Sequence, residues 1–242
     1  MYKFWLNNEY KVQKDFLLNI REYFQQSDNS IHKARNEIKI IDGLVVKSFK
    51  NPNFIKKLIY KFTPSKAKRS YEYSLRLKEF APTPIGYIEF YKNGFLKDSY
   101  FVSEEFKYDF TIREPLLDKN FPNKEEIFKE FAHFTFKLHS NSILHKDYSP
   151  GNILIKKDKN GYIFKIVDVN RMEFRQLLKE ERLKNFDKLW AKDEDLKVIV
   201  KEYAKVAGYD EKEAIKSALY YSQKLKDFKN MKKRIKGIEV VD

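Results

Sequence analysis

The sequence predicts an α+β protein with two lobes: a small β-rich N-terminal lobe over residues 1–105 and a mainly helical C-terminal lobe over residues 106–242. Up to about residue 105, short apolar runs rich in β-branched residues are separated by Asp-Gly and Asn-Gly, which are typical of hairpin turns. Further along, apolar residues recur at helical spacing, interrupted by one more pair of short apolar runs. The lobes join near residues 103–108, so we expect a cleft between them.

The N-terminal lobe begins with residues 10–26, which are helical or irregular, and a first hairpin follows. Its first strand, residues 37–41, carries Ile38 and Ile40 on one face, while Glu37 and Lys39 lie on the other. Asp42-Gly43 forms the turn into a partner strand over residues 44–49.

A helix and a second hairpin complete the N-terminal lobe. Ser65 is a suitable N-cap for a helix from Lys66 to about Phe80, with Ala67, Tyr71 and Leu75 on one stripe. Two prolines, at positions 82 and 84, end this helix. The second hairpin runs through residues 85–90, a turn at Asn93-Gly94, and residues 99–103.

The C-terminal lobe is predicted to open with a helix over residues 124–139, capped by Asn123. Its apolar residues follow helical spacing: Ile127, Phe128, Phe131, Phe134 and Leu138. A loop and a hairpin with strands at 153–155 and 164–167 come next. From Phe174 onward the chain is predicted to be helical, with these residues buried: Leu189, Trp190, Val198, Tyr203 and Leu219.

The composition is that of an ordered globular protein. Of 242 residues, 42% are hydrophobic and 16% aromatic, while Gly and Pro number seven each. The absence of cysteine excludes disulfides and thiolate chemistry, and the four histidines form no zinc-like cluster. The N-terminus lacks the pattern of a signal peptide, and charges interrupt every apolar stretch. We therefore expect a soluble, cytoplasmic protein.

The net charge of +14 favours anionic partners. Eight basic residues and no acidic one lie between Lys47 and Arg69, and seven basic residues against Asp227 alone lie between Lys224 and Lys236. Two interpretations remain open. These stretches are either solvated faces of a lysine-rich chain, or surfaces that contact an anionic membrane or substrate. Nucleic acid is not expected, because no recognisable reader motif accompanies the charge.

One loop carries the pattern of phosphoryl-transfer chemistry. His145 lies two residues before Asp147, Asn152 follows five residues after it, and Asp168 ends the next apolar run. Transfer from ATP needs a carboxylate that orients and deprotonates the attacking hydroxyl, and an amide oxygen and a second carboxylate that hold Mg²⁺. The alternative is an ordinary turn between a helix and a hairpin. His145 is more readily interpreted as bracing the loop than as an acid or base.

Lys47 is the candidate phosphate ligand. In the strand it shares a face with Val45 and Phe49, so its ammonium needs a counter-charge. Glu72 on the predicted helix is the first candidate partner and Glu79 the fallback. The alternative for Lys47 is an edge-strand lysine that reaches solvent.

Together these features resemble the protein-kinase-like fold, and within it the lipopolysaccharide kinase (Kdo/WaaP) family. The resemblance covers about residues 30–190 and rests on these segments: Val46-Lys47-Ser48-Phe49, residues 65–72, residues 83–87, the loop from His145 to Asn152, and residues 168–171. It implies ATP and Mg as cofactors and the following roles: Asp147 as catalytic base, Asn152 and Asp168 as Mg²⁺ ligands, Lys47 as phosphate clamp, and Glu72 as its partner.

The sequence also departs from regulated protein kinases. The first hairpin lacks G-x-G-x-x-G, so phosphate cover must come from elsewhere, near residues 32–36 or the Asp42-Gly43 turn. Asp168 is followed by Val-Asn-Arg rather than Phe-Gly, and Lys146 stands where those enzymes usually carry Arg. Arg171 has two open interpretations, contact with an anionic substrate or pairing with a carboxylate of its own lobe.

The resemblance implies a kinase that phosphorylates a Kdo or heptose hydroxyl of the lipopolysaccharide inner core at the inner face of the inner membrane. Two alternatives remain. One keeps the chemistry with a small-molecule or protein acceptor, and the other is a non-catalytic pseudokinase.

Overall fold

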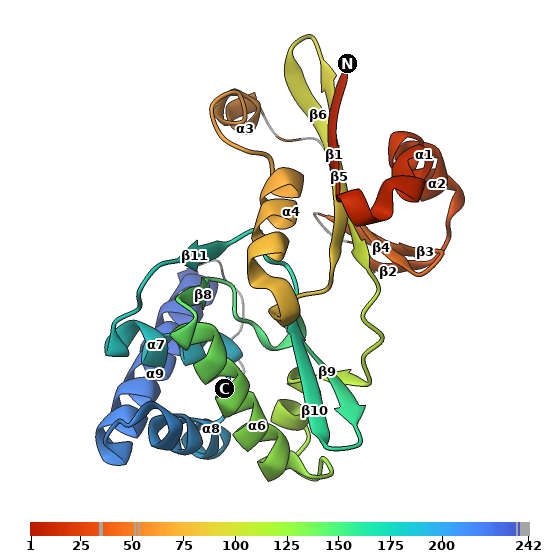
Figure 1. Ribbon diagram of the computed structural model, residues 1–242. Helices are drawn as coiled ribbons and strands as arrows, with labels where there is room; N and C mark the ends of the chain where they lie inside the picture. The colour runs from red at the N-terminus through yellow and green to blue at the C-terminus, as the bar shows by residue number, and fades with distance from the viewer. Residues whose placement is uncertain (34–35, 51, 53, 236, 238–242) are drawn as a thin grey trace. The chain divides into compact units, whose positions relative to one another are not determined.

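The computed structural model describes residues 1–33, 36–50, 52, 54–235 and 237, which form two compact units (Figure 1). Unit 1 comprises Met1–Lys107 together with Val167–Asn170, and unit 2 comprises Tyr108–Ile166 and Arg171–Asp242. The four residues around Asp168 thus belong to unit 1, although the sequence division at residue 105 placed them in the second lobe.

Unit 1 is built on an antiparallel six-stranded sheet with the strand order β1-β5-β6-β4-β3-β2. Both predicted hairpins are confirmed, and their turn residues have positive φ: 50° at Asp42, 74° at Gly43, 51° at Asn93 and 73° at Gly94. The strands are β1 (Tyr2–Leu6), β2 (Ser30–Lys33), β3 (Glu37–Ile41), β4 (Leu44–Lys50), β5 (Pro84–Lys92) and β6 (Phe95–Glu104).

Helices cover both faces of this sheet (Figure 1). On one face α1 (Lys14–Leu18) and α2 (Ile20–Gln26), which follow the 3-10 turn η1 (Asn8–Gln13), pack on a core that includes Val46, Ile88 and Val102. On the other face α4 (Lys66–Leu77) packs on Phe49 and Phe101. The short helix α3 (Phe54–Ile59) precedes α4, and η2 (Lys78–Phe80) follows it.

Helix α4 begins as predicted, because the Ser65 side chain accepts a hydrogen bond from the Lys68 N–H at 3.1 Å. Its buried face differs from the predicted stripe: the buried residues are Ala67, Ser70, Tyr71, Ser74 and Leu77, and Leu75 is 45% exposed. Because successive residues of a helix are rotated by about 100°, Leu75 faces away from the sheet. The small side chains of Ser70 and Ser74 lie on the buried face and allow close packing there.

The buried face of β3 is the one that carries Lys39 and Ile41. The ammonium of Lys39 donates to the carbonyls of Phe24 at 2.7 Å and Ser27 at 2.5 Å, and Lys39 is 8% exposed. These carbonyls lie at the end of α2, where backbone acceptors lack helical partners. A positive charge there is also favoured by the helix dipole.

Unit 2 is mainly helical, with small sheets of strand order β10-β9-β7 and β11-β8. The helix predicted from residue 124 is confirmed, but Asn123 has φ 57° and its side chain makes no cap hydrogen bond. Trp190, expected to be buried, is 45% exposed, because the chain turns there through a left-handed conformation with φ 54°. No helix in the described ranges is long and apolar enough to span a bilayer.

The elements of unit 2 are β7 (Phe110–Thr111), α5 (Arg113–Leu117), α6 (Lys124–Ser140), β8 (Ile143–His145), η3 (Pro150–Asn152), β9 (Ile153–Asp158), β10 (Gly161–Ile166), β11 (Met172–Phe174), α7 (Lys179–Asn185), η4 (Phe186–Leu189), α8 (Asp193–Ala207) and α9 (Glu211–Ile235).

Candidate active site

The part of the candidate site in unit 1 is an ion pair between Lys47 and Asp168. Lys47 lies in β4 with its side chain 11% exposed, and its Nζ is 2.5 Å from Asp168 Oδ1. Asn170 Nδ2 donates to the same oxygen at 2.5 Å. An ammonium so little exposed to water needs a counter-charge, which Asp168 supplies. Two residues that the sequence assigned to phosphate and metal binding therefore meet, although 121 positions separate them.

Glu72, the expected partner of Lys47, lies elsewhere. Its carboxylate is 3.7 Å from Lys68 Nζ, one turn earlier on α4, and its side chain is 45% exposed. Position 72 lies beside the buried stripe of α4 rather than on it, so the carboxylate pairs at the surface. In this structure Asp168 takes the place predicted for Glu72. The fallback partner, Glu79, lies in η2 and is exposed.

The part of the site in unit 2 is the loop from His145 to Asn152, held by its main-chain atoms. The Asp147 N–H donates to His145 Nδ1 at 3.0 Å, and Asn152 Nδ2 donates to the Asp147 carbonyl at 2.9 Å. The Asp147 carboxylate takes part in neither bond and is 41% exposed. The structure thus brings Asp147 and Asn152 together, and it gives His145 the bracing contact expected of it.

Asp168 and Asn152 suit Mg²⁺ by the chemistry of their donor atoms. Asp168 offers a carboxylate and is 31% exposed. The hydrogen bond from Asn152 Nδ2 leaves the side-chain oxygen of Asn152 as the donor atom for a cation. Mg²⁺ is usually bound by one or two carboxylates together with substrate phosphates and water, not by a full protein cage. Among the described residues, no group of three or more His, Asp or Glu side chains is arranged to hold a metal ion.

Two arginines lie close to the loop of unit 2. Arg171 Nη1 is 3.6 Å from Asp147 Oδ2, so it pairs with a carboxylate of its own lobe, as one of its two interpretations predicted. The second arginine is Arg113 of α5, which the sequence did not single out. A Cβ atom on Gly151 would lie 2.5 Å from Arg113 Nη2, so the guanidinium lies directly against the backbone of the loop and would have to shift to admit a side chain there. No sequence motif marks Arg113, because its place depends on the fold of α5 against the loop.

A buried hydrogen-bond relay supports this loop from behind. Asn185 Nδ2 donates to the His145 carbonyl at 3.0 Å, which leaves Asn185 Oδ1 to accept from His139 Nε2 at 3.1 Å. His139 Nδ1 is then the acceptor for the Tyr203 hydroxyl at 2.8 Å. Burial, and to a lesser extent the nearby Arg182 charge, lower the pKa of His139 to about 4, while its bond to Asn185 opposes the shift. His139 is therefore neutral at pH 7, as this direction of donation requires.

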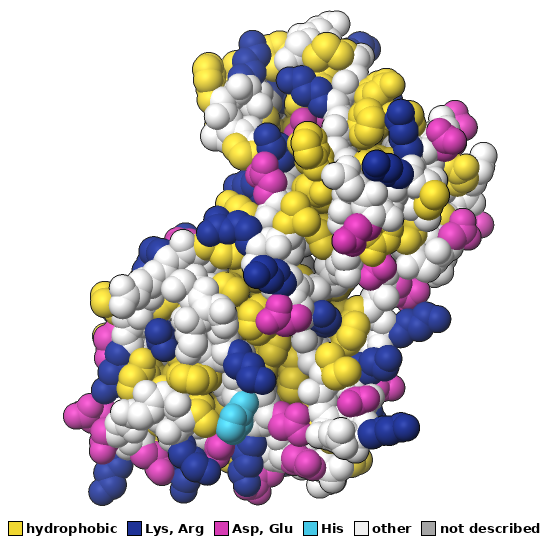
Figure 2. Space-filling model, in the orientation of Figure 1, with side chains coloured by type: hydrophobic (Ala, Val, Ile, Leu, Met, Phe, Trp, Pro, Cys, Tyr) yellow, Lys and Arg dark blue, Asp and Glu magenta, His cyan; other side chains and the backbone are white. Residues whose placement is uncertain are grey.

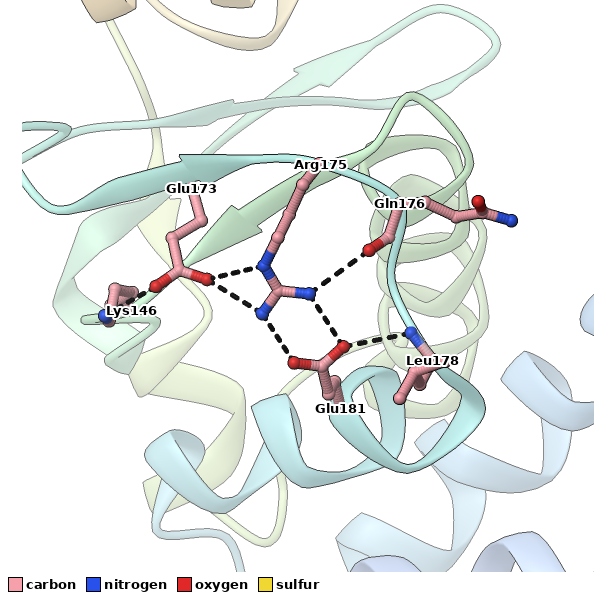
Figure 3. A network of polar contacts seen from close by, with 6 residues as sticks. All are labelled: Lys146, Glu173, Arg175, Gln176, Leu178 and Glu181. Atoms are coloured by element: carbon pink, nitrogen blue, oxygen red, sulfur yellow. Dashed lines mark hydrogen bonds and ion pairs between the residues drawn. The ribbon is translucent and has the colours of Figure 1, made fainter.

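A second network fixes β11 and the start of α7 at the surface (Figure 3). The Arg175 guanidinium donates to Glu181 at 2.9 and 2.5 Å and to Glu173 at 3.1 Å, and Glu173 also pairs with Lys146 at 2.6 Å. Hydrogen bonds from Arg175 and the Leu178 N–H lower the pKa of Glu181 to about 2. Lys146, next to Asp147 in sequence, is thus tied to β11 by a carboxylate.

The sequence suggested two segments as cover for nucleotide phosphates. Residues 34–35, which belong to the segment 32–36 suggested for this role, lie outside the described residues. The other candidate, the Asp42-Gly43 turn, is a tight hairpin in which a side chain on Gly43 would meet no neighbouring atom within 4 Å.

The chain has a lipopolysaccharide kinase-like fold, as the sequence resemblance implied. Its antiparallel sheet carries Lys47, and the helical unit carries the His-x-Asp-x4-Asn loop. The solved structure of WaaP in complex with acyl carrier protein matches 93% of this chain and 98% of its own, with a TM-score of 0.61 at 12% identity. The bifunctional kinase-methyltransferase WbdD matches 62% of this chain and 33% of its own, with a TM-score of 0.44 at 12% identity. No family model and no curated protein sequence matches the chain.

Proposed function

We propose that this protein is a kinase that transfers a phosphoryl group from ATP, with Mg²⁺, to a hydroxyl of a Kdo or heptose sugar of the lipopolysaccharide inner core. The observation that carries the proposal is the ion pair between Lys47 and Asp168. A phosphate-binding lysine and a metal-binding carboxylate must lie near the same phosphates, so their meeting is what phosphoryl transfer requires. The choice of acceptor comes from the sequence resemblance to the lipopolysaccharide kinase (Kdo/WaaP) family, and the fold shared with WaaP agrees with that resemblance.

Each residue then has a defined task. Asp147 orients the acceptor hydroxyl and accepts its proton, while the main-chain bonds to His145 and Asn152 keep the carboxylate in place. Lys47 binds phosphate oxygens, and Asp168 and the Asn152 oxygen hold Mg²⁺, which when bound neutralises charge on the phosphates. Glu72 remains a proposed partner of Lys47, one that would have to replace Asp168 when that carboxylate binds the metal.

Two features favour an anionic acceptor. Arg171 and Arg113 lie at the loop that carries Asp147, and the chain has a net charge of +14. Guanidinium groups bind carboxylates and phosphates through paired hydrogen bonds, and Kdo is itself a carboxylated sugar. We place the protein in the cytoplasm, in peripheral contact with the anionic inner leaflet that displays lipid-linked sugars.

The test is transfer from labelled ATP to a panel of acceptors: deacylated inner-core sugars with Kdo or heptose, small alcohols including aminoglycosides and choline, and a mixture of proteins. Mass analysis of the product identifies the phosphorylated hydroxyl. We expect Mg²⁺-dependent labelling of a core sugar, at higher levels than with the Asp147→Asn protein. Because WaaP was solved with acyl carrier protein, each reaction is run with and without that protein.

Labelling of small alcohols or proteins alone would mean that the protein is a kinase whose acceptor is not a core sugar. Nucleotide binding without transfer to any member of the panel would favour a pseudokinase. Absence of both would contradict the proposal.

A further inference from the structure

An apolar stripe on α3 and the turn that follows it is exposed in unit 1. The helical hydrogen bonding continues past Ile59, because the N–H groups of Phe62 and Thr63 both donate to the Ile59 carbonyl. Positions 55, 58, 59 and 62 have the i, i+3, i+4, i+7 spacing of a single helix face, which normally packs on a core. Here the exposed fractions are 67% at Ile55, 41% at Leu58, 48% at Ile59 and 89% at Phe62.

Lysines surround this stripe. Lys56 and Lys57 lie on α3, and Lys61 follows it, with its Nζ 4.3 Å from the centre of the Phe95 ring of β6. The neighbouring β5–β6 hairpin adds the exposed Lys92 and Lys97. In Figure 2 hydrophobic and basic side chains lie next to each other in this region, which is the α3 end of unit 1 in the orientation of Figure 1.

Acidic side chains near this surface are paired within unit 1. Asp98 of β6 is bound by Arg21 at 2.8 Å, and Glu72 of α4 is paired with Lys68. The sequence contains no acidic residue between positions 47 and 71. The surface is therefore both apolar and positive, and a second copy of the same surface would repel it.

We propose that α3 and its following turn dock on an anionic phospholipid bilayer, with Ile55, Ile59 and Phe62 entering the headgroup region and the flanking lysines contacting lipid phosphates. A short amphipathic segment with a basic border binds membranes in this way, since apolar burial and attraction to anionic lipid act together. The inference deepens the proposed function by stating how the enzyme reaches a lipid-linked acceptor.

The test is flotation of the full-length protein with phosphatidylglycerol-containing vesicles and with pure phosphatidylcholine vesicles, without nucleotide. One variant removes the charges, Lys56→Gln, Lys57→Gln and Lys61→Gln, and a second removes the stripe, Ile55→Ser, Ile59→Ser and Phe62→Ser. One control changes the other basic stretch in the same way: Lys229→Gln, Lys232→Gln and Lys233→Gln. The other, Val12→Ser, changes an apolar residue that is 88% exposed in η1.

We expect the parent protein to float with anionic vesicles only. Loss of three lysines should weaken binding about a hundred-fold, at about five-fold each. Loss of the stripe should weaken it at least about ten-fold. Both controls should bind like the parent protein. The replaced side chains are on the surface, so circular dichroism should not change and the melting temperature should not fall. As an independent readout, Phe62→Trp should add fluorescence that shifts to the blue with anionic vesicles.

Several outcomes would overturn the proposal. Binding that depends on the lysines but not on the stripe would leave only an electrostatic contact. A parent protein that is dimeric, with a monomeric stripe variant, would assign the surface to a second copy. Capture of an acidic soluble protein in place of vesicles would assign it to a protein partner. Absent vesicle binding with intact transfer to a deacylated core sugar would reject this inference alone, whereas vesicle binding without any transfer would reject the proposed function alone.

Discussion

Asp168 combines two unusual properties at the scale of a single residue. Its φ is 56°, in the left-handed region that residues other than glycine seldom adopt. Its carboxylate also accepts hydrogen bonds from Lys47 and Asn170. Such a conformation costs of order 1–3 kcal/mol and persists where surrounding contacts hold it. Here the contacts come from Lys47 of β4 and from Asn170, which lies two positions after Asp168. The strain and the ion pair together place this carboxylate beside Lys47.

Replacing Asp147 by Asn should reduce transfer by about 10²–10⁴-fold, because an amide cannot accept the proton of the acceptor hydroxyl. Nucleotide affinity should stay within about two-fold, since the base contacts the acceptor and not ATP. The loop should keep its conformation, as the bonds to His145 and Asn152 use main-chain atoms of residue 147. Turnover with labelled ATP and calorimetry with Mg·ATP test the two halves of this prediction. Asp158→Asn, at the exposed end of β9, is the control. Substantial turnover in the Asp147 variant would remove this residue from the chemistry.

Replacing Asp168 by Asn should instead weaken Mg·ATP binding by at least about ten-fold, because a metal-binding carboxylate is lost. The variant should also unfold at a lower temperature, since Lys47 then keeps a charge that is mostly buried and has lost the carboxylate with which it pairs. Adding Lys47→Met should recover thermal stability but not nucleotide affinity. Calorimetry and thermal unfolding of the three proteins separate the two effects. Unchanged Mg·ATP affinity in the single variant would make Asp168 a purely structural residue.

At the scale of elements, the loop that carries Asp147 depends on three helices. Asn185 of α7, His139 of α6 and Tyr203 of α8 form a continuous hydrogen-bonded relay that ends at the His145 carbonyl. Every member is buried, so each polar atom needs its partner. The packing of α6 against α8 and the position of the loop are thereby linked. A proton on His139 Nδ1 would turn this nitrogen from an acceptor into a donor, so the Tyr203 hydroxyl could no longer donate to it.

Stability should consequently fall as the pH drops from about 6.5 toward 4, owing to His139. Its pKa is lowered from 6.5 to about 4 in the folded protein, chiefly by burial and also by the charge of Arg182. Between these pH values the unfolded chain binds a proton at residue 139 and the folded chain does not. The contribution of His139 to the free energy of unfolding is therefore fully present above pH 6.5, and about 3 kcal/mol of it is lost as the pH falls toward 4. Urea unfolding across this range should show a smaller pH dependence in His139→Gln. His133→Gln, which removes an exposed histidine from the same helix, should behave as the parent protein. Parallel profiles for all three proteins would contradict the assignment.

At the scale of the whole molecule, the sequence predicted local secondary structure better than it predicted contacts between distant residues. Dipeptide turns and helical spacing located the two hairpins of unit 1 and helices α4 and α6, because those signals act within a few residues. The sequence also brought Lys47 and Asp168 into one proposal. It did not predict Asp168 as the partner of Lys47, or the approach of Arg113 to Gly151, since both depend on segments far apart in the chain. Strand β1 was missed as well, because an edge strand with exposed Tyr2 and Trp5 lacks a clear buried face.

Net charge makes a prediction for the molecule as a whole. An excess of 14 positive charges destabilises a compact chain by self-repulsion, whereas its surface ion pairs contribute little each. Raising the ionic strength from about 0.01 M to about 0.15 M shortens the Debye length from about 30 Å to about 8 Å, so the long-range repulsion is screened more than contacts below 4 Å. The melting temperature should therefore rise with sodium chloride, by about 2–4 °C for each kcal/mol of repulsion removed. The variant Lys229→Gln, Lys232→Gln, Lys233→Gln lowers the charge by three units and should show a smaller rise. Sodium sulfate at equal ionic strength distinguishes screening from anion binding, since a larger rise in sulfate indicates a bound anion. A melting temperature that falls with salt would mean that ion pairs, such as those of Arg175 with Glu181 and Glu173, outweigh the repulsion.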